Sequence, residues 1–333
     1  MTTLLFNHPV CQEHDTGFGH PECSARITAV LNVLHTSPFA ALEWREAPEA
    51  EIEQLARIHP PEYIEKIFAS IPKQGHYAID GDTVVSPRSG AAALRAAGAA
   101  CAAVDAVLRG EADNAFCATR PPGHHAEPKQ AMGFCLFANA AIAAAHARAV
   151  HHLDRVAIVD FDVHHGNGTQ AALQHDPGYL YISTHQAYIY PGTGRREERG
   201  VDNIVNIPLL ANSNSADLRH AWQYDIEPAL NEFRPQLILI SAGFDAHHMD
   251  PLAELNFSED DYKWLTEQIL AIAAEYCSGR VVSVLEGGYS IPALAASVAV
   301  HVRALLEAPK TAQRLLIKGI LARQKAKRDG ARL

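Results

Sequence analysis

The sequence predicts a single α/β domain built on a mainly parallel β-sheet. Short apolar runs rich in β-branched residues alternate with longer segments of helical periodicity, which is typical of strand–helix–strand units. The 333 residues contain no internal repeat and no long Gly/Ser or Pro linker, and α/β domains often exceed roughly 200 residues. The economical prediction is therefore one domain over residues 1–306, followed by a basic tail at 307–333.

The predicted strands are short and apolar. In chain order they are Leu4–Phe6, Ala115–Ala118, Val156–Phe161, Leu180–Ser183, Ile204–Ile207, Leu237–Ser241 and Val281–Leu285. The predicted helices are segments in which apolar residues recur at three- and four-residue spacing. They cover residues 22–35, 61–69, 90–108, 137–150, 168–174, 216–232, 259–277 and 291–306. Apolar residues recur at the same spacing in the tail, which is explained equally well by a docking helix and by a disordered segment.

Composition argues against several classes of protein. No unbroken apolar run reaches the ~18 residues that a membrane span needs, and polar residues interrupt the Ala-rich stretches at 90–108 and 138–150. We therefore expect packed helices and no membrane partner. The first ten residues lack the basic and apolar regions of a secretory signal. The six cysteines form no CxxC pair, which favours a reduced, cytoplasmic setting over a disulfide scaffold.

Charge is unevenly distributed along the chain. The formal net charge is −10, yet the segment from Arg303 to the end carries nine basic against two acidic residues. An acidic body attracts a cationic substrate and repels nucleic acid, so we expect no nucleic-acid partner. The same acidity is explained equally well by the solubility of the protein, which requires no substrate.

Polar motifs directly follow five of the predicted strands. They lie at residues 120–125, 160–168, 183–185, 241–247 and 286–289. In an open parallel sheet the carboxyl ends of the strands share one edge, and ligands bind there. A lone Asp or His at a strand end is usually a cap or a loop residue. Five such motifs together instead predict one crevice that they line jointly.

Asp162, His164 and Asp245 are candidate ligands of a catalytic metal in this crevice. In extended sequence, side chains two residues apart point to the same face, so Asp162 and His164 can bind one ion. Asp245, from another strand, completes three ligands and leaves positions open for water and substrate. Oxygen and nitrogen ligands without a thiolate admit Zn²⁺, Fe²⁺, Co²⁺ or Mn²⁺.

The motifs together resemble the zinc-dependent histone deacetylase family. The resemblance covers about residues 15–303. It is carried by His124-His125 after Pro-Pro-Gly, Asp160-Phe161-Asp162-Val163-His164-His165-Gly166-Asn167-Gly168, Tyr190-Pro191-Gly192-Thr193-Gly194, Gly243-Phe244-Asp245-Ala246-His247 and Glu286-Gly287-Gly288-Tyr289, with Gly19-His20-Pro21-Glu22 and Arg26 near the start. Asn167 and Glu286 resemble the class II branch, which includes bacterial histone deacetylase-like amidohydrolases and acetylpolyamine amidohydrolases. The family fold, the arginase/deacetylase fold, implies an eight-stranded parallel sheet between helices.

The resemblance implies a role for several polar side chains in the predicted crevice. His125 would be the general base and later the general acid, and His124 an electrostatic partner. Tyr289 would donate a hydrogen bond to the oxyanion. Asp160 and Asn167 would orient His124 and His125. Because a carboxamide cannot raise the basicity of an imidazole as a carboxylate does, we expect His124 to be more basic than His125.

The resemblance also implies substrate contacts and a second ion. Gly133, Phe134 and Tyr190 would wall a narrow channel for a linear acyl-lysine stem, with Leu252 at its rim; ordinary core packing also explains an aromatic residue at 134. Asp82 would bind the substrate backbone, although nearby Asp80 competes for that position. A structural K⁺ is implied at a set of residues around the metal ligands. These residues are Asp160, Asp162, His164, Ser183 and Thr184.

Three hypotheses of function follow. The first is a zinc-dependent hydrolase that cleaves the amide of acyl-lysine in a peptide or protein. The second is an acetylpolyamine amidohydrolase; the short segment 75–87 and the apolar Leu252 disfavour it, because such relatives narrow the entrance with a loop or an acidic gatekeeper. The third is a non-catalytic acyl-lysine binder, which the presence of Tyr289 and His125 disfavours. The sequence leaves self-association into a homo-oligomer open.

Overall fold

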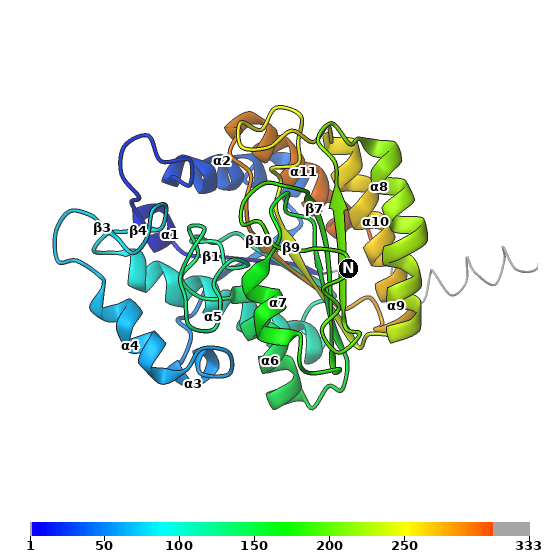
Figure 1. Ribbon diagram of the computed structural model, residues 1–333, viewed down its shortest axis with the longest axis horizontal. Helices are drawn as coiled ribbons and strands as arrows, with labels where there is room; N and C mark the ends of the chain where they lie inside the picture. The colour runs from blue at the N-terminus through cyan, green and yellow to red at the C-terminus, as the bar shows by residue number, and fades with distance from the viewer. Residues whose placement is uncertain (1, 309–333) are drawn as a thin grey trace, which may run out of the picture.

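Eight parallel strands form the central sheet of the computed structural model, which describes residues 2–308 (Figure 1). The strand order is β2-β1-β5-β10-β9-β6-β7-β8. The strands are β1 Thr3–Asn7, β2 Leu42–Glu46, β5 Asn114–Cys117, β6 Val156–Asp160, β7 Tyr179–Gln186, β8 Ile204–Leu209, β9 Leu237–Ala242 and β10 Val281–Leu285. A separate antiparallel hairpin pairs β3 Tyr77–Ala78 with β4 Val84–Val85. The predicted fold class is confirmed.

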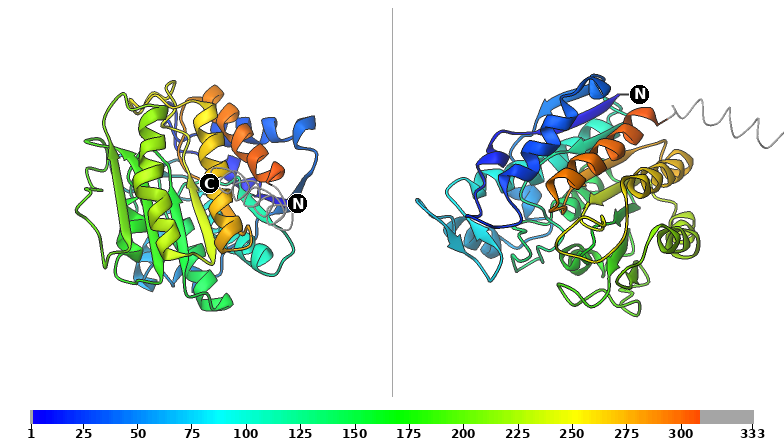
Figure 2. Two further views of the ribbon diagram at one scale, coloured as in Figure 1. Left: turned by 90° about the vertical axis from the view of Figure 1, so that its right-hand side faces the viewer. Right: turned by 90° about the horizontal axis from the view of Figure 1, so that it is seen from above.

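Helices cover both faces of the sheet (Figures 1 and 2). The longer helices are α2 Ser24–Leu34, α4 Pro61–Ala69, α5 Ser89–Leu108, α6 Asn139–His151, α10 Glu259–Tyr276 and α11 Ile291–Glu307. The shorter ones are α1 Val10–Glu13, η1 Ser37–Phe39, α3 Ile52–Leu55, α7 Asn167–Leu173, α8 Ser215–Ala221, η2 Trp222–Ile226 and α9 Glu227–Phe233. The part of the predicted tail that follows Ala308 lies outside the described residues.

Side chains of the strands alternate between two cores. Leu237 and Leu239 of β9 pack in the core that contains α5 and α6, whereas Ile238 and Ile240 pack with α2, α10 and α11. This alternation is the two-residue period of a strand. Because both faces are covered, the central strands are largely apolar, which is why the sequence predicts them as hydrophobic runs.

The structure corrects several predicted boundaries. The pattern missed β2, an edge strand in which only Leu42 is buried, so that its sequence Leu-Glu-Trp-Arg-Glu lacks an apolar run. It also missed the two-residue strands of the β3–β4 hairpin. The single helix predicted at 216–232 contains a π-helical turn, η2, between α8 and α9. The predicted strand ending at Phe161 stops at Asp160.

The Ala-rich helix α5 is a packed core helix, as expected. Within residues 2–308 it is the one helix long and apolar enough to cross a membrane by length and composition, and 67% of that window is buried inside the protein. All six cysteines lie within the described residues and are free, and five of them are buried.

Candidate active site

The five polar motifs meet at one edge of the sheet. They follow β5, β10, β9, β6 and β7, which are five adjacent strands in this order. All pairs among them are parallel, so their carboxyl ends lie at the same edge, as predicted. In Figure 1, α7 begins at this edge in front of the sheet.

A cavity of about 230 Å³ opens at this edge. Three candidate catalytic or metal-binding side chains lie in its wall together with every predicted substrate contact. The lining residues are Asp82, His125, Gly133, Phe134, His164, Tyr190, Leu252 and Tyr289. Residues separated by more than 200 positions in the sequence thus line one narrow space.

Asp162, His164 and Asp245 form a buried cluster that can hold a metal ion. One ligand atom from each lies within 4.8 Å of the others. Nδ1 of His164 is 3.1 Å from Oδ1 of Asp162 and 3.2 Å from Oδ2 of Asp245. That Oδ2 is buried and accepts no hydrogen bond, which is costly for a carboxylate unless another partner binds it. The donor set and the unpaired oxygen therefore fit a divalent cation.

Two glycines bring the backbone against these carboxylates. A Cβ at Gly243 would lie 2.1 Å from Oδ2 of Asp162, and one at Gly287 would lie 2.1 Å from Oδ2 of Asp245. The amide of Gly287 donates to Oδ2 of Asp162 at 2.8 Å. No other residue fits at either position, so these glycines of the two motifs make room for the cluster.

His124 is held between two carboxylates. Its Nδ1 is 3.1 Å from Oδ2 of Asp160, and its Nε2 is 3.7 Å from Oδ2 of Asp162. Tyr181 donates its hydroxyl to the same Oδ2 of Asp160 at 2.9 Å. Burial alone lowers the pKa of His124, but Asp162 and Asp160 outweigh it and raise this pKa well above its ordinary value. The two carboxylates therefore favour the protonated form of this ring.

His125 has the opposite electrostatic environment. Its Nδ1 is 2.9 Å from Oδ1 of Asn167, whose Nδ2 donates to Oε1 of Glu127 at 2.8 Å. The Glu127 contact orients the amide so that Nδ1 of His125 must be the donor, which leaves Nε2 as the free base. Burial, and after it the positive charge of His124, hold the pKa of His125 well below its ordinary value.

Tyr289 lies in the cavity wall as a neutral phenol. Burial first, and then the negative charges of Asp245 and Asp162, raise its pKa well above the ordinary value, although Arg26 opposes them. The Arg26 guanidinium lies 4.9 Å from the centre of the Tyr289 ring and donates to the carbonyl oxygens of Gly288 and Glu286. The hydroxyl of Tyr289 can therefore donate a hydrogen bond, and Arg26 holds the backbone that precedes this residue.

Two carboxylates that sequence reasoning gave no role hold the motifs in place. Glu286 accepts from the amides of Gly123 and His124 at 2.7 and 3.2 Å. Asp250 accepts from the amide of Tyr289 at 2.6 Å and from that of Leu252 at 3.1 Å. Glu286 could have been found from the sequence, because it belongs to the Glu-Gly-Gly-Tyr motif. The role of Asp250 follows only from its hydrogen bonds in the structure.

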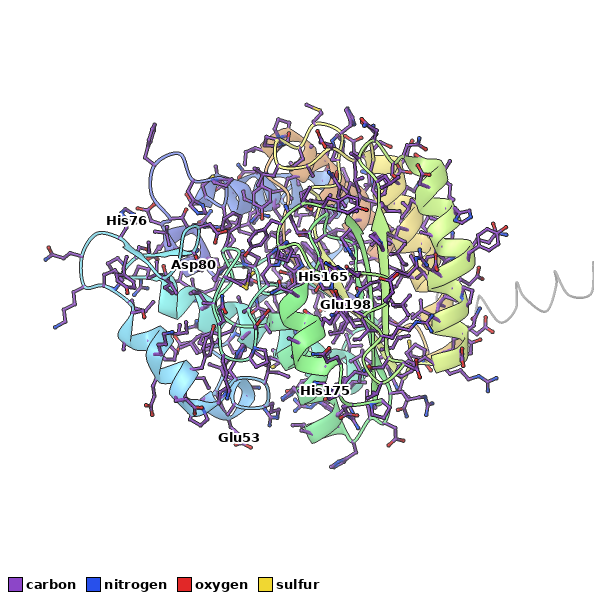
Figure 3. All side chains as sticks on the ribbon, in the orientation of Figure 1. Glu53, His76, Asp80, His165, His175 and Glu198 are labelled. Atoms are coloured by element: carbon purple, nitrogen blue, oxygen red, sulfur yellow. The ribbon has the colours of Figure 1, made fainter. Side chains whose placement is uncertain are left out.

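The rim of the cavity includes Asp82, whereas Asp80 lies outside the lining on the β3–β4 hairpin (Figure 3). Asp80 instead accepts from the amides of Asp82 and Thr83. Nε2 of His20 is 2.9 Å from the carbonyl oxygen of Asp82, and its ring packs edge-on against Phe134. The early Gly-His-Pro-Glu motif therefore supports the rim.

The segment that carries Tyr190 is anchored to the metal-binding loop. Nδ1 of His165 is 2.8 Å from Oγ1 of Thr193, and Nε2 of His185 is 2.9 Å from the carbonyl oxygen of Gly194. The ring of Tyr190 packs edge-on against His125 at 5.1 Å between ring centroids. Figure 3 shows His165 at the end of α7 nearest this site and His175 beyond the other end.

The residues of the predicted K⁺ site also lie together. Asp160 of β6 is the register partner of Ser183 of β7, and Thr184 follows. All three are buried, and Asp160 ends β6 just before the candidate metal ligands Asp162 and His164. The arrangement is compatible with an ion bound mainly by backbone carbonyls, which stays a prediction.

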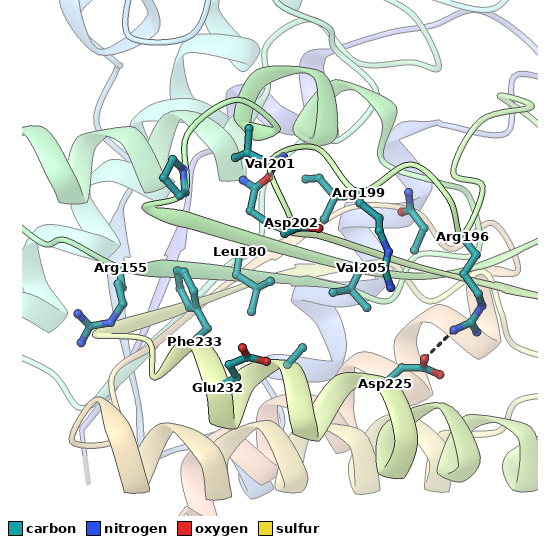
Figure 4. Close-up of a pocket in the computed structure, with 15 residues that line it drawn as sticks. Arg155, Leu180, Arg196, Arg199, Val201, Asp202, Val205, Asp225, Glu232 and Phe233 are labelled. Carbon is teal, nitrogen blue, oxygen red and sulfur yellow. Dashed lines mark hydrogen bonds and ion pairs between the residues drawn. The ribbon is translucent and has the colours of Figure 1, made fainter.

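A larger cavity of about 550 Å³ lies elsewhere, between the β7–β8 side of the sheet and α9 (Figure 4). Its wall includes Arg196, paired with Asp225 at 2.6 Å, and the apolar side chains of Leu180 and Phe233. The acidic and basic side chains in its wall are equal in number, and no residue of the five polar motifs lines it. Size alone therefore does not locate the chemistry.

A parallel α/β sheet whose carboxyl edge carries a buried metal-ligand cluster, an imidazole base and a neutral phenol defines a hydrolase of polar bonds. The family profile of the histone deacetylase domain matches residues 20–305. The chain therefore belongs to the histone deacetylase family.

Individual relatives agree with this assignment. The chain is 43% identical over 275 residues to a histone deacetylase-like amidohydrolase of Pseudomonas aeruginosa, covering 81% of this chain and 72% of that protein. It is 37% identical over 329 residues to the polyamine deacetylase HDAC10 of Homo sapiens, covering 92% and 47%. The crystal structure of the HDA15 HD domain superposes with a TM-score of 0.86 at 31% identity, covering 91% of both chains. The predicted family, fold and enzyme class are confirmed.

Proposed function

We propose that this hydrolase is a zinc-dependent deacylase that cleaves the amide of acyl-lysine in peptides or proteins. The observation that supports it is the cavity that His125, His164 and Tyr289 line together with Phe134 and Tyr190. Zn²⁺ suits a site of two carboxylates and one imidazole with open positions, while Fe²⁺ and Co²⁺ are chemically admissible. The structural K⁺ and a cytoplasmic setting belong to the same proposal.

In this proposal Asp162, His164 and Asp245 would hold the cation, which when bound would supply Lewis-acid chemistry toward the amide carbonyl and a water molecule. Nε2 of His125 accepts the proton of that water, because Nδ1 already carries its proton toward Asn167. The same nitrogen then returns the proton to the leaving amine. The lowered pKa of His125 keeps this nitrogen free at neutral pH.

Tyr289 and His124 stabilise negative charge in this mechanism. The neutral Tyr289 hydroxyl donates a hydrogen bond to the oxygen that becomes negative as the amide carbon turns tetrahedral. The imidazolium of His124, held by Asp160, adds a fixed positive charge in a buried site where charges are weakly screened. The two adjacent histidines thus act differently because their partners differ in charge.

The walls of the cavity favour a slender, linear acyl-lysine stem. Gly133 lies so close to His125 that a Cβ at this position would be 2.4 Å from the imidazole ring. Phe134 and Tyr190 present apolar ring surface to the methylene groups of a lysine stem. At the rim, Asp82 offers a carboxylate that can accept from a peptide amide, and the exposed, apolar Leu252 offers no charge that would attract a cation.

An acetylpolyamine is the second candidate substrate. It is favoured by the printed name of the human relative, a polyamine deacetylase, and by the formal net charge of −10. Leu252 disfavours it, because an apolar side chain at the mouth gives no electrostatic preference for a second ammonium group.

A kinetic panel tests the substrate. We expect the zinc-loaded enzyme to show kcat/KM at least about tenfold higher for acetyl-lysine peptides than for acetylated polyamines, a difference of ~1.4 kcal/mol in transition-state binding. Longer acyl-lysines in the same panel define the preferred acyl group. A higher kcat/KM for the polyamine would overturn the substrate proposal while leaving the hydrolase itself intact.

Leu252→Glu should shift this preference toward cationic amines. A carboxylate near a protein surface attracts an ammonium about 4 Å away by up to ~4 kcal/mol, so we expect the polyamine-to-peptide ratio of kcat/KM to rise about tenfold or more. Leu252→Gln, of the same size but uncharged, is the matched control. An equal ratio for both variants would mean that residue 252 does not face the substrate.

Asp250→Asn should reduce turnover through the backbone of Tyr289. One oxygen of Asp250 accepts from the amides of Tyr289 and Ser290 and the other from Leu252, and an asparagine can accept on one side only. We expect kcat to fall about tenfold, ~1.4 kcal/mol, with the metal content unchanged. Asp202→Asn, at an exposed position, is the control; wild-type kcat for Asp250→Asn would exclude the positioning role.

A further inference from the structure

A second group of potential metal ligands lies between helices α5 and α6. Nε2 of His146 is 2.8 Å and Nε2 of His151 is 2.6 Å from Oδ1 of Asp105. One ligand atom from each residue lies within 4.8 Å of the others. None of the three belongs to the motifs at the active site, and His151 is not the plain helix-surface residue that adjacent His151-His152 suggests in the sequence.

The group lies at the opposite edge of the sheet from the active site. Asp105 is in the last turn of α5, which ends shortly before β5 begins, and His151 ends α6, shortly before β6 begins. Both helix ends therefore lie near the amino ends of their following strands, whereas the catalytic motifs follow the carboxyl ends. A variant in this group should leave the catalytic geometry unchanged.

The immediate surroundings favour metal binding over a purely structural contact. His146 is buried, while Asp105 and His151 are half-buried, so one side of the group is open to water. Nη2 of Arg109 lies 3.5 Å from Oδ2 of Asp105, which leaves Oδ1 directed at the two imidazoles. Arg57 is the other cation whose charge reaches the group. The two imidazole nitrogens and Oδ1 of Asp105 thus lie close enough together to bind one ion.

The protonation states suit a metal as well. Burial lowers the pKa of His146, although Asp105 opposes this effect, so the ring is neutral at neutral pH. Burial raises the pKa of Asp105, but its hydrogen bonds to His151 and His146 outweigh that and lower it. A neutral imidazole and an ionised carboxylate are the forms that bind divalent metals.

We propose that Asp105, His146 and His151 form a second divalent-metal site, distinct from the active site, that links α5 to α6. Two imidazole nitrogens and one carboxylate oxygen match Zn²⁺, with water from the open side as the fourth ligand. Bonds of about 2.0–2.2 Å place tetrahedral ligand atoms ~3.3 Å apart, so the two contacts to Asp105, at 2.8 and 2.6 Å, need to open by about 0.5 to 0.7 Å. His151, at the last position of α6, can move that far.

Zinc stoichiometry tests the proposal. With zinc as the probe, measured by metal analysis after equilibrium dialysis, we expect two equivalents per wild-type chain, one for each ligand group. His151→Gln and Asp105→Asn should each lose one equivalent and keep wild-type hydrolysis of an acetyl-lysine reporter. His152→Asn is the matched control, because His152 is exposed and has φ 55°, a conformation that asparagine accepts; it should keep both equivalents.

The active-site variant His164→Ala separates this proposal from the proposed function. It should retain one equivalent of zinc while losing hydrolysis, and adding His151→Gln should remove that equivalent; the two groups share no residue. Because a ligand that binds only the folded state raises its melting temperature, zinc should raise the Tm of His164→Ala but not of the double variant. One equivalent in wild type, or two in His151→Gln, would overturn the second site and identify Asp105, His146 and His151 as a metal-free hydrogen-bonded cluster.

Discussion

Tyr289→Phe is expected to bind metal and substrate normally while losing most turnover. The hydroxyl is the single donor lost, since the ring keeps its contacts with Phe134 and Arg26. Removal of one oxyanion donor typically lowers kcat about 10²–10³-fold, or ~2.7–4 kcal/mol. An interaction made mainly in the transition state lowers kcat and kcat/KM together, so KM should change little. Steady-state kinetics on an acetyl-lysine peptide measure both constants.

Tyr224→Phe provides the matched control. Its side chain is 61% exposed on η2, so removal of its hydroxyl should leave kcat unchanged. Metal analysis must give the same zinc content for both variants and wild type. Near-normal hydrolysis by Tyr289→Phe at full metal content would contradict the oxyanion role and would require another donor at the cavity.

Metal removal is expected to abolish hydrolysis. Without a cation, Asp162, His164 and Asp245 offer no electrophile for the amide carbonyl, and Oδ2 of Asp245 stays buried without a hydrogen bond. Several kilocalories per mole of transition-state stabilisation disappear, so we expect the rate after exhaustive chelation to fall more than about 10²-fold. Added Zn²⁺ should restore it, and Co²⁺ or Fe²⁺ restoring more would identify the preferred metal.

The chelation experiment is sharpest in the His151→Gln background, where zinc can refill only the active site. One equivalent should then restore full hydrolysis, and Asp245→Ala should not respond at any zinc concentration. Activity that survives complete metal removal would rule out the metal-dependent mechanism while leaving the family assignment unchanged.

The sequence predicted the strands best where both sheet faces are covered. The runs of β6 and β9 are apolar at every position before the first polar motif, and β10 is interrupted only by the buried Ser283, so their ends and the motifs that follow could be read directly. β2 was missed because it is an edge strand with only Leu42 fully buried. Local sequence thus reports burial, and it fails where a strand is stabilised mainly by pairing with a neighbour.

The candidate site was predicted where its chemistry lies in short motifs. Asp162, His164, His125 and Tyr289 were identified from the residues that flank them. Asp250 and Glu127 were not, because their roles depend on hydrogen bonds to Tyr289, 39 positions away, and to Asn167, 40 positions away. A lone carboxylate in a sequence gives no indication of such a partner.

By itself the sequence determined which side chains stand at the ends of buried strands, and therefore which chemistry the protein has available. Only the tertiary structure decided that β5, β10, β9, β6 and β7 are neighbours and that Gly287 contacts Asp162 across 125 positions. It likewise brought His146 and His151 onto Asp105. The physical reason is that periodicity encodes burial within one element, whereas strand order and helix contacts arise from the packing of the whole chain.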